Sequence, residues 1–384
     1  RAGQTILVRN HELQPESIDQ GPFGAKNELL GKLDPKGIYD RGRGIKPSLG
    51  GTTTLIYDHK TQTVQNQFLS LAGTIRNCAG GTTPWGSWLT CEETAVSADN
   101  VFERDHGYVF EVPSQAQALV EPVALKAMGR FSHEAVVVDP RNGIIYETED
   151  RNDGLFYRFI PNTPNQLTRG GRLQALVVRD KKSADTRNWL LADGGAGRQF
   201  EQSGRFTHRY AVEWSEMDEV EAPKDDLRAR GFAAGAARFA RGEGIVWDKN
   251  AVYFACTNGG PARKGQIWRY IPSPVEGTAQ EKNQPGYLEL FIEADAGTLV
   301  ENADNLCVAP WGDLVVCEDG SAPQYVVGVT PQGQCYHIAK NALNSKEFAG
   351  ATFSPDGSTL FVNIYQPGVT LAITGPWQNA TQKA

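Results

Sequence analysis

The stretch Ala309-Pro-Trp-Gly-Asp-Leu-Val-Val-Cys-Glu-Asp-Gly320 decides the fold, because it joins a tight turn to a strand that ends in acidic side chains. The turn contains Gly312, and such turns need a positive φ, which glycine and asparagine adopt at little cost. The same order of strand, turn and strand recurs in four other stretches, at residues 83–93, 138–150, 246–258 and 353–365. The sequence therefore predicts an array of β-hairpins.

These hairpins follow one another in steps of 56, 109, 61 and 45 residues, counted between Pro84, Pro140, Lys249, Pro310 and Pro355. The longest step is about twice the others, so we expect a degenerate copy inside it, at Gly171–Val178. A repeat of roughly 55 residues built of hairpins is typical of a β-propeller. We predict an all-β, six-bladed β-propeller with loop and short-helix insertions. Seven blades is the alternative count, and a β-sandwich is the competing fold.

The composition is that of an ordinary globular protein. Its 384 residues are 40% hydrophobic and 22% charged, and 38 bases against 45 acids give a net charge of −7. Nucleic-acid phosphates need clustered Lys and Arg, so we expect no nucleic-acid partner. The 41 glycines and two methionines fit many short strands better than a helical bundle. We expect a single domain over residues 1–384, acting as a monomer on a small molecule.

No apolar run approaches the ~20 residues that a membrane-spanning helix needs, so no membrane span is expected. Arg1 leads directly into a strand-like segment at Thr5–Val8, and we expect a signal segment to have been removed from a periplasmic or secreted protein. The six cysteines contain no CxxC pair, which excludes a zinc ribbon or a thioredoxin motif. A disulfide between Cys307 and Cys317 stays open if their strands are neighbours.

The strands of the hairpins end in acids or amides. These residues are Asn10, Glu12, Glu92, Glu93, Glu149, Asp150, Asn258, Glu318, Asp319 and Asn363. In a propeller, equivalent strand ends point toward one mouth of the central channel, and carboxylates gathered there repel each other unless a cation neutralises them. Calcium takes six to eight oxygen ligands of this kind. The pattern predicts metal at the propeller mouth, with simple solvation of the strand ends as the alternative.

Cys91 stands directly before Glu92 and Glu93 at a strand end. A thiol beside two carboxylates offers soft and hard ligands together, which suits a redox metal better than calcium alone. The alternative is that Cys91 is a small buried hydrophobe.

Two further segments bear candidate functional side chains. Residues Gly129–Glu134 place His133 and Glu134 before an apolar strand, either as metal ligands or as a capped turn. Arg241 and Glu243 flank a glycine, and an arginine beside a metal cluster is suited to binding an oxyanion such as phosphate. A surface ion pair is the alternative reading of that segment.

Together these motifs resemble the PhoX family of alkaline phosphatases, also described as PhoX-like or domain of unknown function 839. The matching stretches run nearly from end to end and are residues 6–12, 77–93, 106–112, 129–134, 241–243, 265–270, 303–306 and 354–363. The Ser-Pro-Asp-Gly turn at residues 354–357 occurs in many propellers and is the least specific.

The resemblance implies a six-bladed propeller that hydrolyses phosphate esters with Fe3+ and Ca2+, exported folded to the periplasm or cell surface. It implies that Cys91 is a catalytic iron ligand, joined by Glu12, Glu92 or Glu93, Glu134 and Glu243. It further implies calcium at Asp150, Asp304 and Asp319. On the same basis, Arg241 holds the substrate phosphate with help from Asn258.

Two other functions compete with the phosphatase. One is a calcium-dependent propeller lactonase or sugar-acid hydrolase, which needs neither the thiol nor the arginine. The other is a non-catalytic, metal-stabilised binding propeller. The sequence contains no GxSxG, HExxH, Walker or GxGxxG motif, so serine hydrolases, zincins, P-loop NTPases and Rossmann enzymes lack support.

Overall fold

The computed structural model describes residues 3–191, 197–203, 208–321 and 323–377. The chain forms two compact units whose segments alternate along the sequence. Unit 1 comprises Arg1–Glu149, Arg158–Leu173 and Glu216–Leu227, and unit 2 comprises Asp150–Tyr157, Gln174–Ser215 and Arg228–Ala384. The expectation of a single domain over residues 1–384 stays a prediction.

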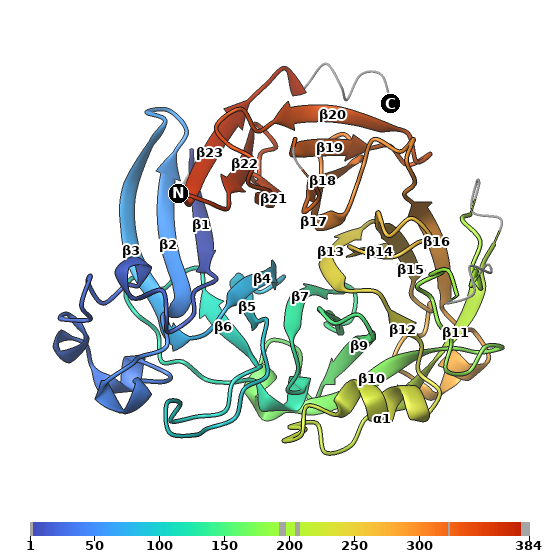
Figure 1. Cartoon of the computed structure of the whole chain (residues 1–384), viewed down its shortest axis with the longest axis horizontal. Coiled ribbons are helices and arrows are strands. Elements are labelled where there is room, and N and C mark those ends of the chain that lie inside the picture. The colour runs from blue at the N-terminus through green and yellow to red at the C-terminus, as the bar shows by residue number, and fades with distance from the viewer. Residues whose placement is uncertain (1–2, 192–196, 204–207, 322, 378–384) are drawn as a thin grey trace. The chain divides into compact units, whose positions relative to one another are not determined.

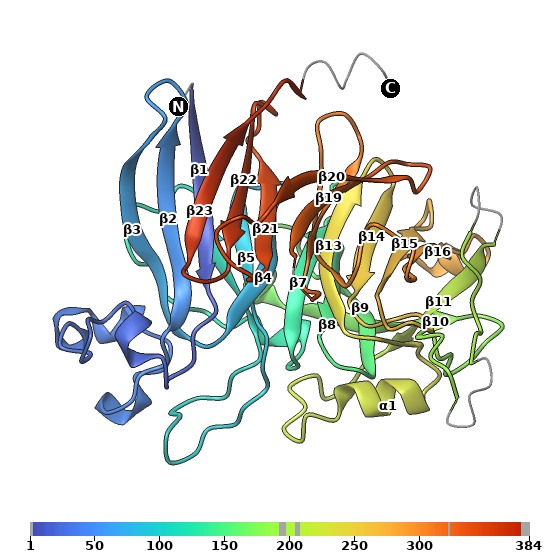
Figure 2. The same cartoon turned by 45° about the horizontal axis from the view of Figure 1, so that its top comes forward.

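Unit 1 is built of antiparallel strands. They are β1 (Gln4–His11), β2 (Gly50–Asp58), β3 (Thr63–Thr74), β4 (Asn77–Thr82), β5 (Ser87–Glu92), β6 (Val109–Pro113), β7 (His133–Val138) and β8 (Ile145–Glu149). The sheets have the orders β1-β2-β3 and β4-β5-β6, and β7 pairs with β8. Figures 1 and 2 both show β1, β2 and β3 side by side as one long, twisted sheet.

The core of unit 1 lies where loops cover this sheet. Phe23 and Leu30 come from the segment between β1 and β2 and pack with Leu49 and Ala72. A second cluster joins Tyr39 to Leu71, Tyr108, Phe110 and Val112. The long segment after β1 is thus held against the ends of the strands by buried apolar side chains.

Unit 2 contains the remaining complete strands. They are β12 (Arg238–Phe239), β13 (Gly242–Asp248), β14 (Ala251–Cys256), β15 (Gln266–Ile271), β16 (Tyr287–Glu293), β17 (Ala303–Val308), β18 (Leu314–Glu318), β19 (Tyr325–Val329), β20 (Cys335–Lys340), β21 (Phe348–Phe353), β22 (Thr359–Ile364) and β23 (Val369–Thr374). Their sheets run β13-β14-β15-β16, β17-β18-β19-β20 and β21-β22-β23, the last two drawn in orange to red in Figure 1.

Aliphatic side chains on successive sheets form the core of unit 2. Ile267 and Phe291 pack with Val316 and Val327. Val315 and Val326 pack with Leu360 and Val362. Strands such as β18, Leu-Val-Val-Cys-Glu, are apolar on both faces because a neighbouring sheet covers each side.

Four elements each contain residues of both units: β9 (Gly154–Pro161), β10 (Gly171–Val178), β11 (Tyr210–Glu216) and α1 (Leu227–Ala233). The predicted segment Gly171–Val178 is a strand with those bounds, although its status as a repeat copy is untested. Short 3-10 helices lie at Ile18–Gln20, Leu30–Lys32, Pro35–Gly37, Gly42–Gly44, Lys126–Met128, Leu167–Arg169 and Ala279–Lys282. The all-β prediction is confirmed, and six blades stays a prediction.

The repeat seen in the sequence is a repeat of β-bulges. In five ladders of the described strands, two residues on the first strand stand opposite one on the second. The doublets are Cys78–Ala79, Glu134–Ala135, Glu243–Gly244, Asp304–Asn305 and Gly350–Ala351. A bulge bends its strand and re-aims a side chain, and bulges are common beside active sites.

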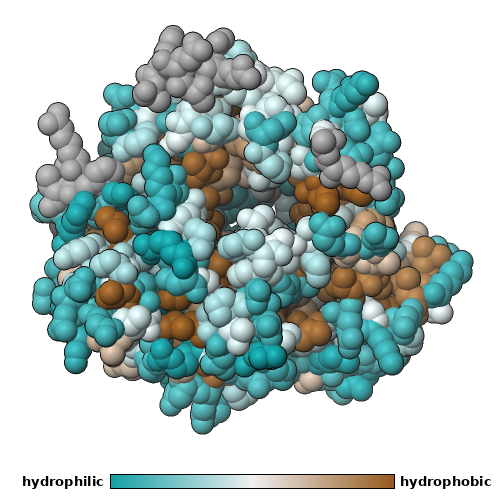
Figure 3. All heavy atoms as spheres, turned by 180° about the vertical axis from the view of Figure 1, so that it is seen from behind, coloured by the Kyte–Doolittle hydropathy of each residue, from teal (hydrophilic) through white to brown (hydrophobic). Residues whose placement is uncertain are grey.

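All six cysteines lie in described segments and are free thiols, so Cys307 and Cys317 are not paired. Cys307 stands opposite Val315 and Cys317 opposite Val326, so the two thiols do not face each other across the β17–β18 ladder. No helix in the described part of the chain has the length and apolarity of a membrane span. The face drawn in Figure 3 is mainly hydrophilic, with hydrophobic side chains in separate patches.

Candidate metal and phosphate site

The first bulge of unit 1 places Cys78 at the start of β4. The side-chain amide of Asn10 donates hydrogen bonds to the carbonyl oxygens of Cys78 (3.0 Å) and Ala79 (2.8 Å). The carbonyl of the same amide accepts from the indole N–H of Trp88 (2.9 Å) and the hydroxyl of Thr90 (2.9 Å). Asn10, one of the predicted polar strand ends, therefore fixes the bulge instead of facing a ligand.

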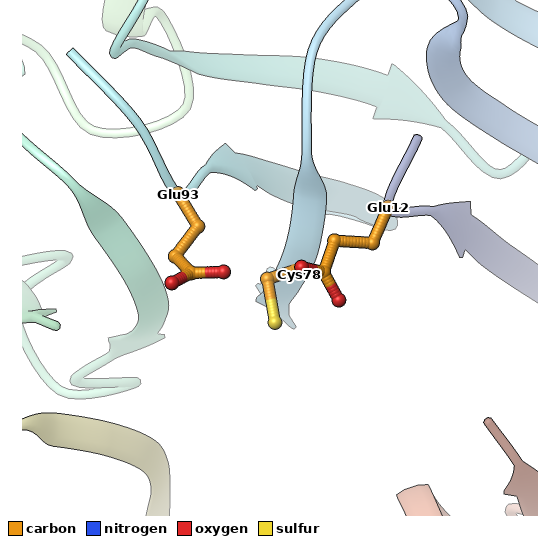
Figure 4. Close-up of side chains that lie close together, drawn as sticks. All are labelled: Glu12, Cys78 and Glu93. Atoms are coloured by element: carbon orange, nitrogen blue, oxygen red, sulfur yellow. The ribbon is translucent and has the colours of Figure 1, made fainter. Parts of the chain in front are cut away.

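Cys78 meets the residues that follow β1 and β5. The Sγ of Cys78 and a carboxylate oxygen from each of Glu12 and Glu93 all lie within 4.8 Å of one another. Figure 4 shows the two carboxylates on either side of the thiol. The Cys78 thiol also donates to Oε1 of Glu134 at 3.3 Å, which brings in the second bulge of unit 1.

Arg76, in the connection between β3 and β4, contacts both carboxylates of this cluster. Its Nη2 lies 3.1 Å from Oε1 of Glu12 and 2.5 Å from Oε2 of Glu93. Its backbone N–H donates to the carbonyl of Leu13 and its carbonyl accepts from the N–H of Glu93. Burial alone would lower the pKa of Arg76, but the carboxylates of Glu93 and Glu12 outweigh it and raise that pKa. The arginine thereby ties the ends of β1 and β5 together.

The donor set of this cluster fits a transition metal. A thiol supplies a soft ligand and the carboxylates of Glu12, Glu93 and Glu134 supply hard ones, a combination that suits iron better than calcium. Glu93 and Glu134 are buried, and Glu12 and Cys78 are half-buried, so the donors are partly shielded from bulk solvent.

Cys91, the predicted thiol ligand, stands opposite the Cys78–Ala79 bulge in the β4–β5 ladder, and its role as a ligand stays a prediction. It sits inside β5 with no exposed surface, opposite Val109 of β6. Burial, together with the carboxylates of Glu147 and Glu134, raises the pKa of its thiol well above the usual range. The structure therefore associates Cys78, and not Cys91, with Glu12 and Glu93.

Glu92 is held by protein groups, and its predicted role as a metal ligand stays a prediction. Its carboxylate accepts from the backbone N–H groups of Ile75, Gly107 and Tyr108 and lies 2.6 Å from Nδ1 of His106. Nε2 of His106 lies 3.2 Å from Asp40. Burial would lower the pKa of His106, but Glu92 and Asp40 outweigh it and raise it to about 9.

His133 is likewise occupied by protein groups. Its Nε2 lies 3.1 Å from the carbonyl oxygen of Gly129, and its Nδ1 lies 3.2 Å from Oε2 of Glu147. Burial lowers the pKa of His133 to about 3 and raises the pKa of Glu147. His133 thus faces protein groups, and Glu134 is the candidate ligand of this motif.

Arg241 is the centre of an acidic cluster in unit 2. Its guanidinium contacts both oxygens of Asp150 (2.8 and 3.2 Å), Oε1 of Glu243 (2.8 Å) and Oδ2 of Asp319 (3.8 Å). Burial would lower the pKa of Arg241, but Glu243, Asp150 and Asp319 outweigh it and raise it. The structure thus brings Asp150 and Asp319 to the motif that contains Arg241 and Glu243.

The backbone holds Arg241 in a fixed position. Its N–H donates to the carbonyl of Arg151 and its carbonyl accepts from the N–H of Thr257. Arg241 has φ +54° and Arg76 has φ +47°, both in the left-handed region that non-glycine residues rarely adopt. Such conformations cluster at functional sites, where the surrounding structure maintains them.

Two other predicted residues of unit 2, Asp304 and Asn258, contact neighbours of this arginine. Glu243 and Asp304 occupy equivalent bulges in β13 and β17, and each offers a carboxylate oxygen within 4.8 Å of the other's. Asn258 follows Thr257, and its side-chain amide donates to Oδ1 of Asn152 at 2.7 Å.

The two adjacent acids at a strand end have different contacts. Glu318 accepts from the N–H groups of Glu301 (2.8 Å) and Tyr325 (3.2 Å), as Glu92 does from its own neighbours. Burial raises the pKa of Glu318 to about 7 despite these bonds. The second acids, Glu93 and Asp319, contact the arginines instead. The first acid of such a pair therefore stabilises loops, and the second faces the site.

Cys78 and Arg76 were missed by the sequence reasoning. A signal was present, because Cys78, Glu134, Glu243 and Asp304 each stand six residues before a turn residue of the repeat. The proximity of Cys91 to two glutamates in sequence was the more conspicuous pattern and was misleading, since Glu92 points into the protein.

A β-rich chain with a thiol–carboxylate cluster and an arginine held among acids is a metal-dependent phosphatase in class. A family model described as alkaline phosphatase PhoX matches residues 47–368. The chain belongs to the PhoX family of alkaline phosphatases and is a phosphoric ester hydrolase. Glu12 precedes the matched range, so its place in the site rests on the geometry.

The fold is similar to that of Pseudomonas fluorescens PhoX in complex with vanadate, a transition state analogue. The identity is 18%, the match covers 95% of this chain and 81% of that chain, and the TM-score is 0.65. At this identity the likeness shows the fold alone, which is of the β-propeller type.

Weaker likenesses include a gluconolactonase from Xanthomonas campestris, at 15% identity over 84% of this chain and 78% of that chain, with a TM-score of 0.39. Another is a periplasmic gluconolactonase from Pseudomonas aeruginosa, at 12% identity over 84% and 72%, with a TM-score of 0.39. Such scores support no argument about this chain. No curated protein sequence matches it.

Proposed function

We propose that this phosphatase uses an iron ion held by Cys78 with Glu12, Glu93 and Glu134, and calcium held by acids near Arg241. The observation that carries the proposal is the convergence of one thiol and two carboxylates within 4.8 Å of one another, from three separate strand ends. A lactonase needs no such thiol, so the cluster favours the phosphatase over that alternative. Asp150, Glu243, Asp304 and Asp319 are the oxygen donors proposed for calcium.

When bound, these metal ions supply charge to neutralise phosphate oxygens and to activate water. The side chains of the protein position the phosphate and supply positive charge to it. Arg241 presents a planar guanidinium that can bind two phosphate oxygens at once. Asp150 and Glu243 hold that guanidinium in place before substrate arrives, so little side-chain freedom is lost on binding. Asn258, which follows the Thr257 that donates its N–H to Arg241, is proposed to assist in holding the phosphate.

Substitution of Arg241 tests this assignment. Arg241→Lys keeps the charge but removes the two-pronged geometry, and we expect kcat/KM for an aryl phosphate ester to fall by about 100-fold or more. Arg104 is an exposed arginine in unit 1 and serves as the control. Arg104→Lys should keep the wild-type rate. A rate within twofold of wild type in both variants would contradict the role of Arg241.

We also propose a monomer in the periplasm or outside the cell, as expected for the family. Sedimentation of the purified protein at micromolar concentration should give the monomer mass of 41.9 kDa. Fractionation of the source cells should place the activity outside the cytoplasm. A dimer mass, or activity confined to the cytoplasm, would contradict the respective half of this proposal.

A further inference from the structure

The insertion between β10 and β11 contributes an aromatic side chain that the proposed chemistry does not use. Two arginines lie over the ring of Trp189, with the guanidinium carbon 4.1 Å from the ring centroid for Arg187 and 3.8 Å for Arg263. An indole ring has two faces, and two cations this close to its centroid cannot share one of them. The result is a stack of arginine, tryptophan and arginine.

The loop with Trp189 is rigidly attached to unit 2. The side-chain amide of Asn188 donates to Oε2 of the buried Glu293 at 2.7 Å, and that of Gln266 donates to the same oxygen at 2.8 Å. Oδ1 of Asn188 accepts from the N–H groups of Gln199 and Phe200. The stack is therefore built into the fold and does not depend on a free surface loop.

Hydrogen bonds connect the stack to the segments that hold Arg241. The indole N–H of Trp189 donates to the carbonyl of Asn258 at 2.8 Å. Asn302 donates to the carbonyls of Thr257 (2.8 Å) and Arg263 (3.2 Å), and Thr257 donates its N–H to Arg241. The segments that contain Arg241 and Arg263 are thus connected by hydrogen bonds.

The two arginines of the stack differ in charge balance. Arg187 pairs with Asp185, with contacts of 2.7 and 2.6 Å, and Asp185 also pairs with Arg238. Arg263 is exposed, and none of the described residues forms an ion pair with it. Its guanidinium lies over the indole ring, which restricts the positions that its donors can take. A fixed, uncompensated guanidinium is an anion-binding group.

We propose that Arg263, oriented by Trp189, binds a second anionic group in the leaving group of the substrate. This inference rests on the proposed role of Arg241 at the phosphate. The substrate class is then a phosphate monoester with a carboxylate or a second phosphate a few bonds from the ester oxygen. Arg263 selects the substrate, and Trp189 is a positioning residue.

The test compares two esters that differ at one carbon. Phosphoglycerate has a carboxylate where glycerol phosphate has a neutral hydroxymethyl group. We expect the metal-loaded wild-type enzyme to prefer phosphoglycerate by about tenfold in kcat/KM, which corresponds to one charged hydrogen bond. Arg263→Gln should remove most of that preference, and rising salt should weaken it in the wild type.

Arg104→Gln is the matched control, because Arg104 is also an exposed arginine over an aromatic ring, 5.1 Å from the centroid of Tyr39. It should keep the preference. A wild-type enzyme without the preference, or Arg263→Gln with the preference intact, would overturn the inference while leaving the phosphatase proposal standing. Failure of the metal-loaded wild type to hydrolyse either ester would contradict both.

Discussion

At the scale of single residues, the site depends on which member of each acidic pair faces it. Glu92 and Glu93 are chemically the same and adjacent in the chain, yet Glu92 is bound by three backbone N–H groups and His106 while Glu93 contacts Arg76. Sequence alone offers no means to separate them, because the bends that follow the strand decide which way each side chain points.

Substitution of these two glutamates should give opposite phenotypes. Glu92→Gln removes a buried charge beside His106 and should lower the free energy of unfolding by about 3 kcal/mol, with metal content preserved in the folded fraction. Glu93→Gln should lower iron content and activity, while Arg76 keeps its contact with Glu12. Urea unfolding and elemental analysis of both variants check this, and the reverse assignment would contradict it.

At the scale of elements, repeated bulges place ligands on neighbouring strands. The packing of β13 against β17 brings backbone very close at Gly244, where an added Cβ would lie 2.5 Å from the carbonyl oxygen of Asp304. The glycine is needed for this close approach. The motif containing Arg241 and Glu243 therefore serves packing as well as chemistry.

Gly244→Ala should displace Glu243 and Asp304 together. We expect a loss of about 1–3 kcal/mol in the free energy of unfolding and a fall in calcium affinity, since the new methyl group meets backbone and no flexible side chain. Gly31→Ala is the control, because nothing lies within 4 Å of its added Cβ. Calorimetric titration with calcium checks both variants. An unchanged affinity in Gly244→Ala would argue against the proposed calcium ligands.

The contact of His106 with Glu92 and Asp40 joins three segments and should give a pH dependence. Its pKa is raised from 6.5 to about 9, so its contribution to stability is complete below pH 6.5 and is lost as pH rises through about 9. The contribution is at most about 3 kcal/mol. Urea unfolding at pH 6 and pH 9 should show this decline in the wild type and a flatter profile in His106→Gln. Equal slopes in both proteins would refute the assignment.

At the scale of the whole molecule, the sequence predicted the repeated hairpins and the all-β class, and its site residues stay predictions. Glu12, Glu93, Glu134, Asp150, Arg241, Glu243, Asp304 and Asp319 were selected before the structure and lie in the two clusters. The spacing of the turns and the polar strand ends could be read from the sequence, because a hairpin forms between residues that are close together in the chain. The choice of Cys78 as the proposed thiol ligand could not be made from local sequence. It required the bulge at Cys78 and the approach of three strand ends.

The most direct test of the central claim is the iron content of two cysteine variants. Cys78→Ser and Cys91→Ser should be purified alongside the wild type and examined by elemental mass spectrometry and visible absorption. The account predicts that Cys78→Ser loses iron, the thiolate-to-iron absorption band and phosphatase activity, while folded Cys91→Ser keeps all three. Retention of iron and the band in Cys78→Ser, with their loss in Cys91→Ser, would contradict it.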